Sequence, residues 1–107
     1  ITATDLFATL ELPGITYVQA YIENLPFPDK SFDIVTCHHT IEHVRELDKV
    51  IAELKRVTRN QMIIVTPRQR YYYYTLDLHL HFFPQKEDLT ELINLARFEC
   101  FDYDGDW

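Results

Sequence analysis

A chain of 107 residues suffices for one small domain, and 47% hydrophobic with 25% charged residues is ordinary for a globular protein. The formal net charge of −7 argues against nucleic acid as the main partner, because proteins that bind phosphates present a basic face. No apolar run approaches the length needed to cross a membrane, so we expect no membrane partner. Cys37 and Cys100 are far apart in sequence, and we expect two reduced thiols in a cytoplasmic protein.

Strand and helix patterns alternate along the chain. Runs of β-branched and aromatic residues between turn signals predict strands at residues 1–5, 15–20, 32–37, 62–66 and 98–103. Apolar residues at three- and four-residue steps predict amphipathic helices at residues 45–58 and 88–95. This alternation predicts an α/β fold with a mostly parallel sheet and flanking helices.

The most informative segment surrounds the third predicted strand. A proline-rich turn at residues 24–31 leads into residues 32–37, which are apolar at nearly every position, as in a strand buried on both faces of a parallel sheet. A polar loop with three histidines follows at residues 38–43. Ligands of open α/β sheets bind at the carboxyl ends of strands, so this loop indicates a binding site.

The beginning of the chain and its glycines suggest a partial domain. The sequence opens directly on a strand pattern without Met, and Gly14 and Gly105 are its only glycines. Nucleotide-binding α/β domains usually carry a Gly-rich turn after their first strand. We therefore expect residues 1–107 to be one partial domain of a longer protein.

The spacing His39-x-x-Glu42-His43 matches an inverted zinc-peptidase motif, to which His79 and His81 could add ligands. That motif requires both histidines on an established helix, but here it begins directly after a strand. A zinc-dependent hydrolase using His39, Glu42 and His43 therefore remains a minor alternative, and the main interpretation includes no metal.

Several segments in order resemble a known family. They are ENLPFPDKSFDIVTC at residues 23–37, EHV at 42–44, ELKRV at 53–57 and TP at 66–67. Together they resemble class I S-adenosylmethionine-dependent methyltransferases of type 11, and are most similar to the quinone-biosynthesis O-methyltransferases. The resemblance covers about residues 1–95. It implies a Rossmann-like fold, S-adenosylmethionine as cofactor, and methyl transfer to a small-molecule acceptor.

The resemblance assigns cofactor contacts to the ends of the first two strands. Asp5, followed by Leu6, matches the acidic residue that binds the ribose, and one carboxylate can accept hydrogen bonds from both hydroxyls. Tyr21, Ile22 and Glu23 match the loop that contacts the adenine. An Asp often stands in the family where Tyr21 stands here. Tyr21 could instead stack on the ring or pack in the core, and backbone groups of Ile22 and Glu23 become the better candidates.

The end of the third strand matches the methionine side of the cofactor. The resemblance places Cys37 and His38 there, with His43 in the loop between cofactor and acceptor. Methyl transfer requires alignment and, for an oxygen acceptor, removal of a proton. Because imidazole titrates near neutrality, His43 and His81 are the candidate catalytic bases. Both could equally be loop or packing residues.

Aromatic residues after the fourth strand are candidates for the acceptor side. Tyr71, Tyr74 and Phe82 could form an apolar cover over the substrate, or could simply cover the sheet. The resemblance does not indicate the oligomeric state. Lys55 and Arg56 in ELKRV are expected to be structural.

One part of the family pattern is missing from the chain. The first strand and its Gly-rich loop, which cradles the methionine part of the cofactor, have no counterpart here. In the family that strand stands between those ending at Asp5 and Cys37. We expect these two strands either to pair directly or to leave a gap, and the 107-residue chain to bind the cofactor weakly. A non-catalytic binding module that kept the fold is the alternative.

Overall fold

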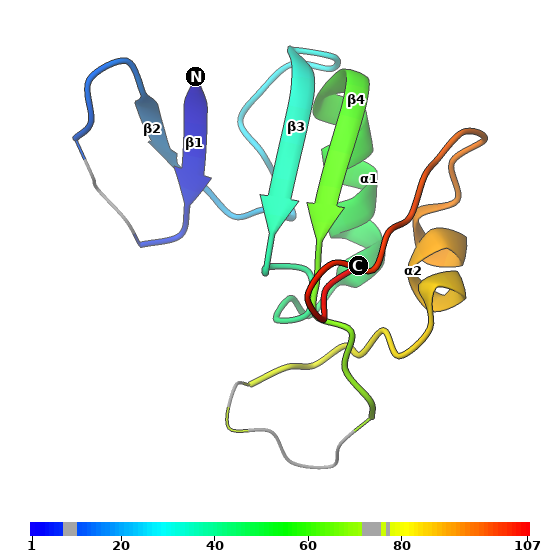
Figure 1. The fold of residues 1–107 in the computed structure, drawn as a ribbon. Helices are drawn as coiled ribbons and strands as arrows, with labels where there is room; N and C mark the ends of the chain where they lie inside the picture. The colour runs from blue at the N-terminus through cyan, green and yellow to red at the C-terminus, as the bar shows by residue number, and fades with distance from the viewer. Residues whose placement is uncertain (8–10, 72–75, 77) are drawn as a thin grey trace.

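The computed structural model describes residues 1–7, 11–71, 76 and 78–107 (Figure 1). Its elements in chain order are β1 (Thr2–Asp5), β2 (Thr16–Gln19), β3 (Phe32–His38), α1 (Leu47–Val57), β4 (Thr58–Val65) and α2 (Lys86–Ile93). The first four predicted strands and both predicted helices are confirmed, with shifted ends. Within the described residues, neither helix is long and apolar enough to cross a membrane.

The four strands form two separate parallel pairs. β1 pairs with β2 from Thr2–Thr16 to Asp5–Gln19, and β3 pairs with β4 up to His38–Val65. All four arrows point the same way in Figure 1, so their carboxyl ends lie at one end of the molecule. The strands ending at Asp5 and His38 do not pair with each other. Of the two arrangements expected from the sequence, the structure therefore shows the gap.

Helix α1 covers one face of the β3–β4 pair. Its buried face consists of the apolar residues at helical spacing, namely Val50, Ile51, Leu54 and Val57. Asp48 in the first turn and Lys55 and Arg56 in the last turn have the signs that the helix dipole favours. Burying each such apolar side chain contributes roughly 1.5–3 kcal/mol. The helix therefore anchors this half of the molecule (Figure 1).

The loop after β3 belongs to the core, although its sequence suggested a polar loop. Ile41 is completely buried and Val44 nearly so, and both pack with residues of α1 and with Phe83 and Leu89. Glu42, which lies between Ile41 and Val44 in the sequence, is also buried, at 1% exposure. The buried side chains of Ile41 and Val44 thus hold this loop against the core.

Two predictions about strands are wrong. β3 is not buried on both faces, because α1 covers only one of them; Cys37 is its one buried residue and Ile34 is 57% exposed. Residues 98–103 do not form a strand, and Phe98 and Phe101 are exposed. Tyr103 makes only an isolated bridge to Asp106, since Gly105 with positive φ turns the chain back on itself.

Candidate functional site

A cavity of about 1040 Å³ lies between the two strand pairs. Its walls come from β1 and the turn after it, from residues 20–23 after β2, from β3, and from residues 39–45. The cavity brings together all seven residues predicted to contact a cofactor and one predicted base: Asp5, Leu6, Tyr21, Ile22, Glu23, Cys37, His38 and His43. Residues far apart in the sequence therefore converge on one space.

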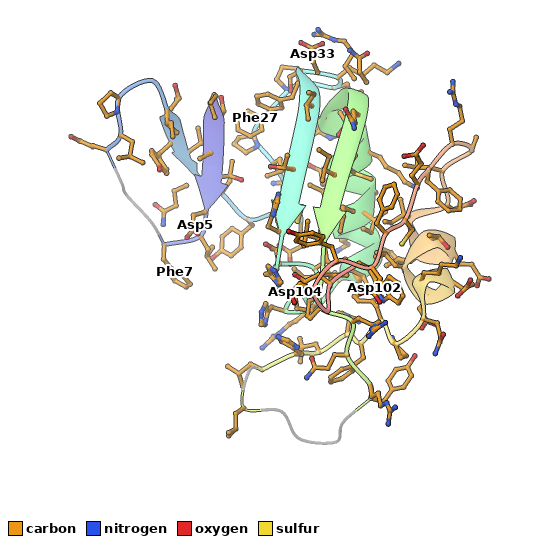
Figure 2. The ribbon with its side chains drawn as sticks, viewed as in Figure 1. Asp5, Phe7, Phe27, Asp33, Asp102 and Asp104 are labelled. Carbon is orange, nitrogen blue, oxygen red and sulfur yellow. The ribbon has the colours of Figure 1, made fainter. Side chains whose placement is uncertain are left out.

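Asp5 ends β1 beside this cavity (Figure 2). Its Oδ1 accepts a hydrogen bond from the backbone N–H of Phe7 at 2.7 Å, which orders the turn after the strand. The side chain of Gln19 donates to the carbonyl of Leu6 at 2.9 Å, and Ala20 N–H donates to the carbonyl of Asp5. These bonds tie the carboxyl ends of β1 and β2 together and fix the position of the Asp5 carboxylate.

Tyr21 begins the loop after β2. The residue is 68% exposed, so its side chain does not pack in the core. Ile22 is half-buried and packs against the core cluster, while the carbonyl of Tyr21 accepts from Asn24 N–H at 3.0 Å. Tyr21 was expected either to stack on a ligand or to pack in the core, and the structure is compatible only with the first of these roles.

The turn that leads into β3 is held by two side chains of α1. Arg56 donates to the carbonyls of Phe27 and Leu25 at 2.7 and 3.0 Å, and Glu53 accepts from Leu25 N–H at 2.9 Å. Arg56 also pairs with Asp29 and Glu53. Hydrogen bonds from Arg56 lower the pKa of the Glu53 carboxyl, and the same pairs raise the pKa of Arg56. The ELKRV and LPFPD segments are therefore one structural unit, which sets the entry of β3.

The carboxyl end of β3 forms the opposite wall. Burial raises the pKa of the Cys37 thiol, so Cys37 is a packing group at neutral pH and not a thiolate. The carbonyl of His38 accepts from Thr40 Oγ1 at 2.8 Å, and His39 N–H donates to Val65 O at 2.9 Å. His39 has positive φ, so the chain turns sharply out of the strand.

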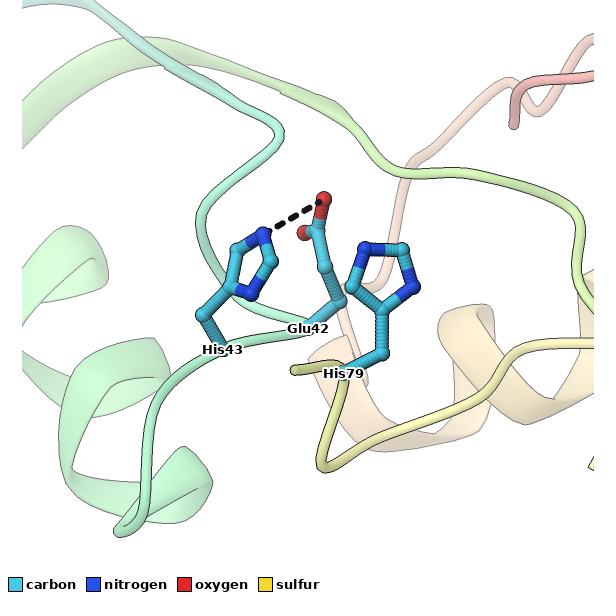
Figure 3. A group of neighbouring side chains, drawn as sticks. All are labelled: Glu42, His43 and His79. Carbon is cyan, nitrogen blue, oxygen red and sulfur yellow. Dashed lines mark ion pairs between the residues drawn. The ribbon is translucent and has the colours of Figure 1, made fainter. Parts of the chain in front are cut away.

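The motif His39-x-x-Glu42-His43 lies in this turn and not on a helix. The arrangement that the inverted zinc-peptidase motif requires, with two histidines on one helical face, is therefore not formed. The structure instead groups Glu42 and His43 with His79 (Figure 3).

The described residues among those predicted for the acceptor side do not line the cavity. The rings of Tyr71 and Phe82 are 5.9 Å apart, and His81 Nε2 lies 2.8 Å from the carbonyl of Val44. Neither Tyr71, Phe82 nor His81 lines the cavity between the strand pairs, and Tyr74 lies outside the described residues. Arg45, which sequence reasoning missed, lines the cavity; its place directly after EHV was the available signal.

A family model described as a methyltransferase domain matches residues 2–66, which is more than half of the chain. The chain belongs to this methyltransferase family. The matched segment ends one residue after β4. It therefore contains both strand pairs and every residue that lines the cavity except Ile1.

The curated relatives are also named methyltransferases. The chain is 27% identical to the ubiquinone/menaquinone biosynthesis C-methyltransferase UbiE of Psychromonas ingrahamii, over 84% of this chain and 48% of that protein. It is 39% identical to the uncharacterized methyltransferase YcgJ of Bacillus subtilis, over 43% of this chain and 18% of that protein. The chain thus spans about half the length of UbiE. UbiE is named a C-methyltransferase, whereas the segments in the sequence resembled the O-methyltransferases of quinone biosynthesis.

Solved structures show the same Rossmann-like fold. A protein of Anabaena variabilis assigned as a methyltransferase of antibiotic biosynthesis matches with a TM-score of 0.68 and 23% identity, over 87% of this chain and 43% of that one. The (4+2)-cyclase SpnF matches with a TM-score of 0.59 and 20% identity, over 75% of this chain and 30% of that one. At these identities the likeness shows the fold alone, and SpnF is a reminder that one fold supports different reactions.

Proposed function

We propose that this methyltransferase-family chain takes part in S-adenosylmethionine-dependent methyl transfer to a small-molecule acceptor. One observation carries the proposal: seven residues assigned to cofactor contacts from the sequence line a single cavity between the strand pairs. These residues come from β1, the loop after β2 and β3, which are far apart in the sequence. Family membership supplies the reaction class.

The residues present suit the two ends of such a cofactor differently. Asp5, fixed by Phe7 N–H and at a strand end, would hold the ribose hydroxyls, with Tyr21, Ile22 and Glu23 beside the adenine. Cys37 and His38 would line the methionine side, where Arg45 adds a positive charge suited to a carboxylate. No Gly-rich turn follows any strand among the described residues, so we expect the 107-residue chain to bind the cofactor only weakly.

When bound, the cofactor supplies an electrophilic methyl group. The chain's own part is to orient the acceptor and to move a proton. His43 suits this role best, because it lines the cavity and its side chain is partly exposed. His81 suits it less, because it does not line the cavity and its Nε2 is hydrogen-bonded to the Val44 carbonyl. Tyr71, Tyr74 and Phe82 remain proposals for the acceptor side, and the names of the relatives suggest a quinone precursor as a first acceptor to test.

A cytoplasmic setting is part of the same proposal. Cys37 and Cys100 are both free thiols, which suits a reducing compartment. A second candidate function, a module that keeps the fold without transferring methyl groups, is suggested by the likeness to SpnF. Transfer of labelled methyl from S-adenosylmethionine to a quinone precursor would distinguish the two. We do not propose hydrolysis, because His39 and His43 do not share a helical face.

The test is calorimetric titration of S-adenosylhomocysteine into the full-length natural protein and into its Asp5→Ala variant. Each hydrogen bond from a hydroxyl to a carboxylate contributes about 1.5–3 kcal/mol, so we expect Asp5→Ala to weaken binding by at least about tenfold. Asp48→Ala is the matched control, because Asp48 is exposed on α1 and does not line the cavity. Equal affinities of Asp5→Ala and wild type would contradict the proposed site. Failure of the wild type to bind would contradict the function.

A further inference from the structure

We propose that Glu42, His43 and His79 form a binding site for a divalent transition metal of the zinc type. One ligand atom from each residue lies within 4.8 Å of the others. Figure 3 shows one ring nitrogen of each histidine turned toward the Glu42 carboxylate, which lies between the two rings. The rings of His43 and His79 meet edge to face, with centroids 4.7 Å apart.

Backbone hydrogen bonds hold the three residues together. The carbonyl of Glu42 accepts from Leu80 N–H at 2.7 Å and from His81 N–H at 3.1 Å. These two bonds fasten the segment after residue 77 to the loop after β3, which places His79 beside Glu42. Glu42 and His43 are adjacent in the chain, and the buried side chains of Ile41 and Val44 fix the loop on either side of them. Parts of the chain that are distant in sequence therefore bring the three residues together.

The carboxylate of Glu42 is the observation that points to a ligand. It is 1% exposed, and its Oε1 receives no hydrogen bond from any described residue. Within the described part of the chain, its Oε2 has only a long contact with Thr66 Oγ1 at 3.4 Å. The nearest basic nitrogens, His39 Nδ1 at 3.6 Å and His43 Nε2 at 3.9 Å, are beyond hydrogen-bond distance of Oε1. Burying a carboxylate with so few hydrogen bonds costs folding free energy, and a bound cation would offset this cost by neutralising its charge.

The partners of the two imidazoles favour coordination through Nε2. His43 Nδ1 lies 3.4 Å from the carbonyl of Leu78, and His79 Nδ1 is hydrogen-bonded to Oε1 of Gln69. Both partners are oxygens that accept, so each Nδ1 carries the hydrogen and each Nε2 the lone pair. Metal-binding histidines typically make such an outer hydrogen bond through the second nitrogen. His39 is not a ligand in this proposal, because its Nε2 pairs with Asp106 at 3.2 Å.

The donor set selects the kind of metal. Two imidazoles and one carboxylate suit zinc, whereas magnesium and calcium prefer oxygen ligands throughout. A tetrahedral zinc ion holds its ligand atoms about 3.3 Å apart, so the group would close by about an ångström or more on binding. Three protein ligands leave a fourth position open. His43 also lines the cavity between the strand pairs, so the metal would lie next to its wall.

The test is a Zn²⁺ titration of chelator-stripped protein in competition with a chromogenic chelator, with His79→Asn as the main variant. We expect one zinc ion per chain in the wild type and an affinity at least about tenfold lower in His79→Asn. His38→Asn is the matched control, because His38 is an exposed histidine outside the group, and its affinity should change less than twofold. Millimolar Mg²⁺ should not displace the zinc.

Two further measurements guard against misfolding. Circular dichroism must show that His79→Asn keeps the wild-type fold, and Co²⁺ bound to the wild type should give the absorption of a tetrahedral site that His79→Asn and Glu42→Gln lose. Less than one zinc per chain, or equal losses in His79→Asn and His38→Asn, would overturn the proposal. His43 is shared with the proposed methyl-transfer site, but the result can be told apart from the cofactor test, because that test changes Asp5, which is not a metal ligand, and His79 does not line the cofactor cavity.

Discussion

The two parallel strand pairs have the same hydrogen-bonding pattern but different surroundings. Helix α1 lies against β3 and β4, and the buried core contains Cys37 of β3 together with residues of α1 and of the loop between them. In contrast, no residue of β1 or β2 is buried, and Ile1 and Phe7 at the two ends of β1 are exposed. Since isolated two-stranded ladders are marginal in water, burial against a helix, not strand pairing, distinguishes the stable half.

The candidate cofactor site lies across this difference. Asp5 and Tyr21 come from the poorly covered pair, whereas Cys37, His38 and His43 come from the packed half. The cavity therefore combines a wall with little buried surface and a wall that belongs to the core. Arg56 and Glu53 of α1 are the main polar link to the turn between the halves.

The largest expected effect is a difference in unfolding free energy between a substitution in α1 and one in the β1–β2 pair. Leu54→Ala removes a side chain only 3% exposed and should cost about 2–5 kcal/mol of unfolding free energy, from lost burial and the cavity left behind. Val18→Ala in β2 removes a half-buried side chain and should cost less than about 1 kcal/mol. Urea denaturation of both variants measures the difference. Equal losses would show that the β1–β2 pair is as well packed as its partner.

The same contrast explains what the sequence could reveal. The period of α1 was predictable because its apolar face at Val50, Ile51 and Leu54 is a local pattern, and the predicted ends lie within two residues of the observed ones. The burial of β3 was predicted wrongly, because exposure of Ile34 depends on what covers the far face of the strand. An apolar run indicates that a strand can be buried, but it does not indicate whether another element is present to cover it.

The two candidate sites also differ in how far sequence could locate them. The cavity residues were assigned through the resemblance to a family, residue by residue, and the fold then brought them together. The grouping of Glu42 with His79 was beyond any spacing rule, because it depends on hydrogen bonds from Leu80 and His81 to the Glu42 carbonyl. The motif spacing instead pointed to His39, which pairs with Asp106.

A smaller effect should follow when acid protonates Glu53 and weakens its ion pair with Arg56. The folded-state pKa of Glu53 is lowered from its ordinary value of 4.5 by Arg56, so the unfolded chain binds a proton more readily than the folded one. Its contribution to stability is present above that ordinary value and is lost as pH falls through the lowered folded pKa. Glu53→Gln should therefore lower the melting temperature by several degrees at pH 7, and by progressively less as the pH is lowered below 4.5.

Glu46→Gln provides the matched control for this experiment. Glu46 pairs with Lys49 at the start of the same helix, and both side chains are mostly exposed. Exposed pairs contribute little, so this variant should melt close to the wild type throughout this pH range. A Glu53→Gln difference that grows as pH falls would contradict the assigned direction of the pKa shift.

The smallest perturbation, and the finest measure of the difference in packing, is thiol reactivity. Burial raises the pKa of both Cys37 and Cys100, but Cys37 is buried in the core cluster while Cys100 is partly exposed. Only the thiolate reacts, and only when the reagent reaches it, so Cys100 should be modified first and Cys37 much more slowly. An Ellman assay of the wild type should show two phases, and Cys100→Ser should lose the fast one. If Cys37 reacts as fast as Cys100 without denaturant, the half that contains α1 opens readily, and the contrast between the two strand pairs does not hold in solution.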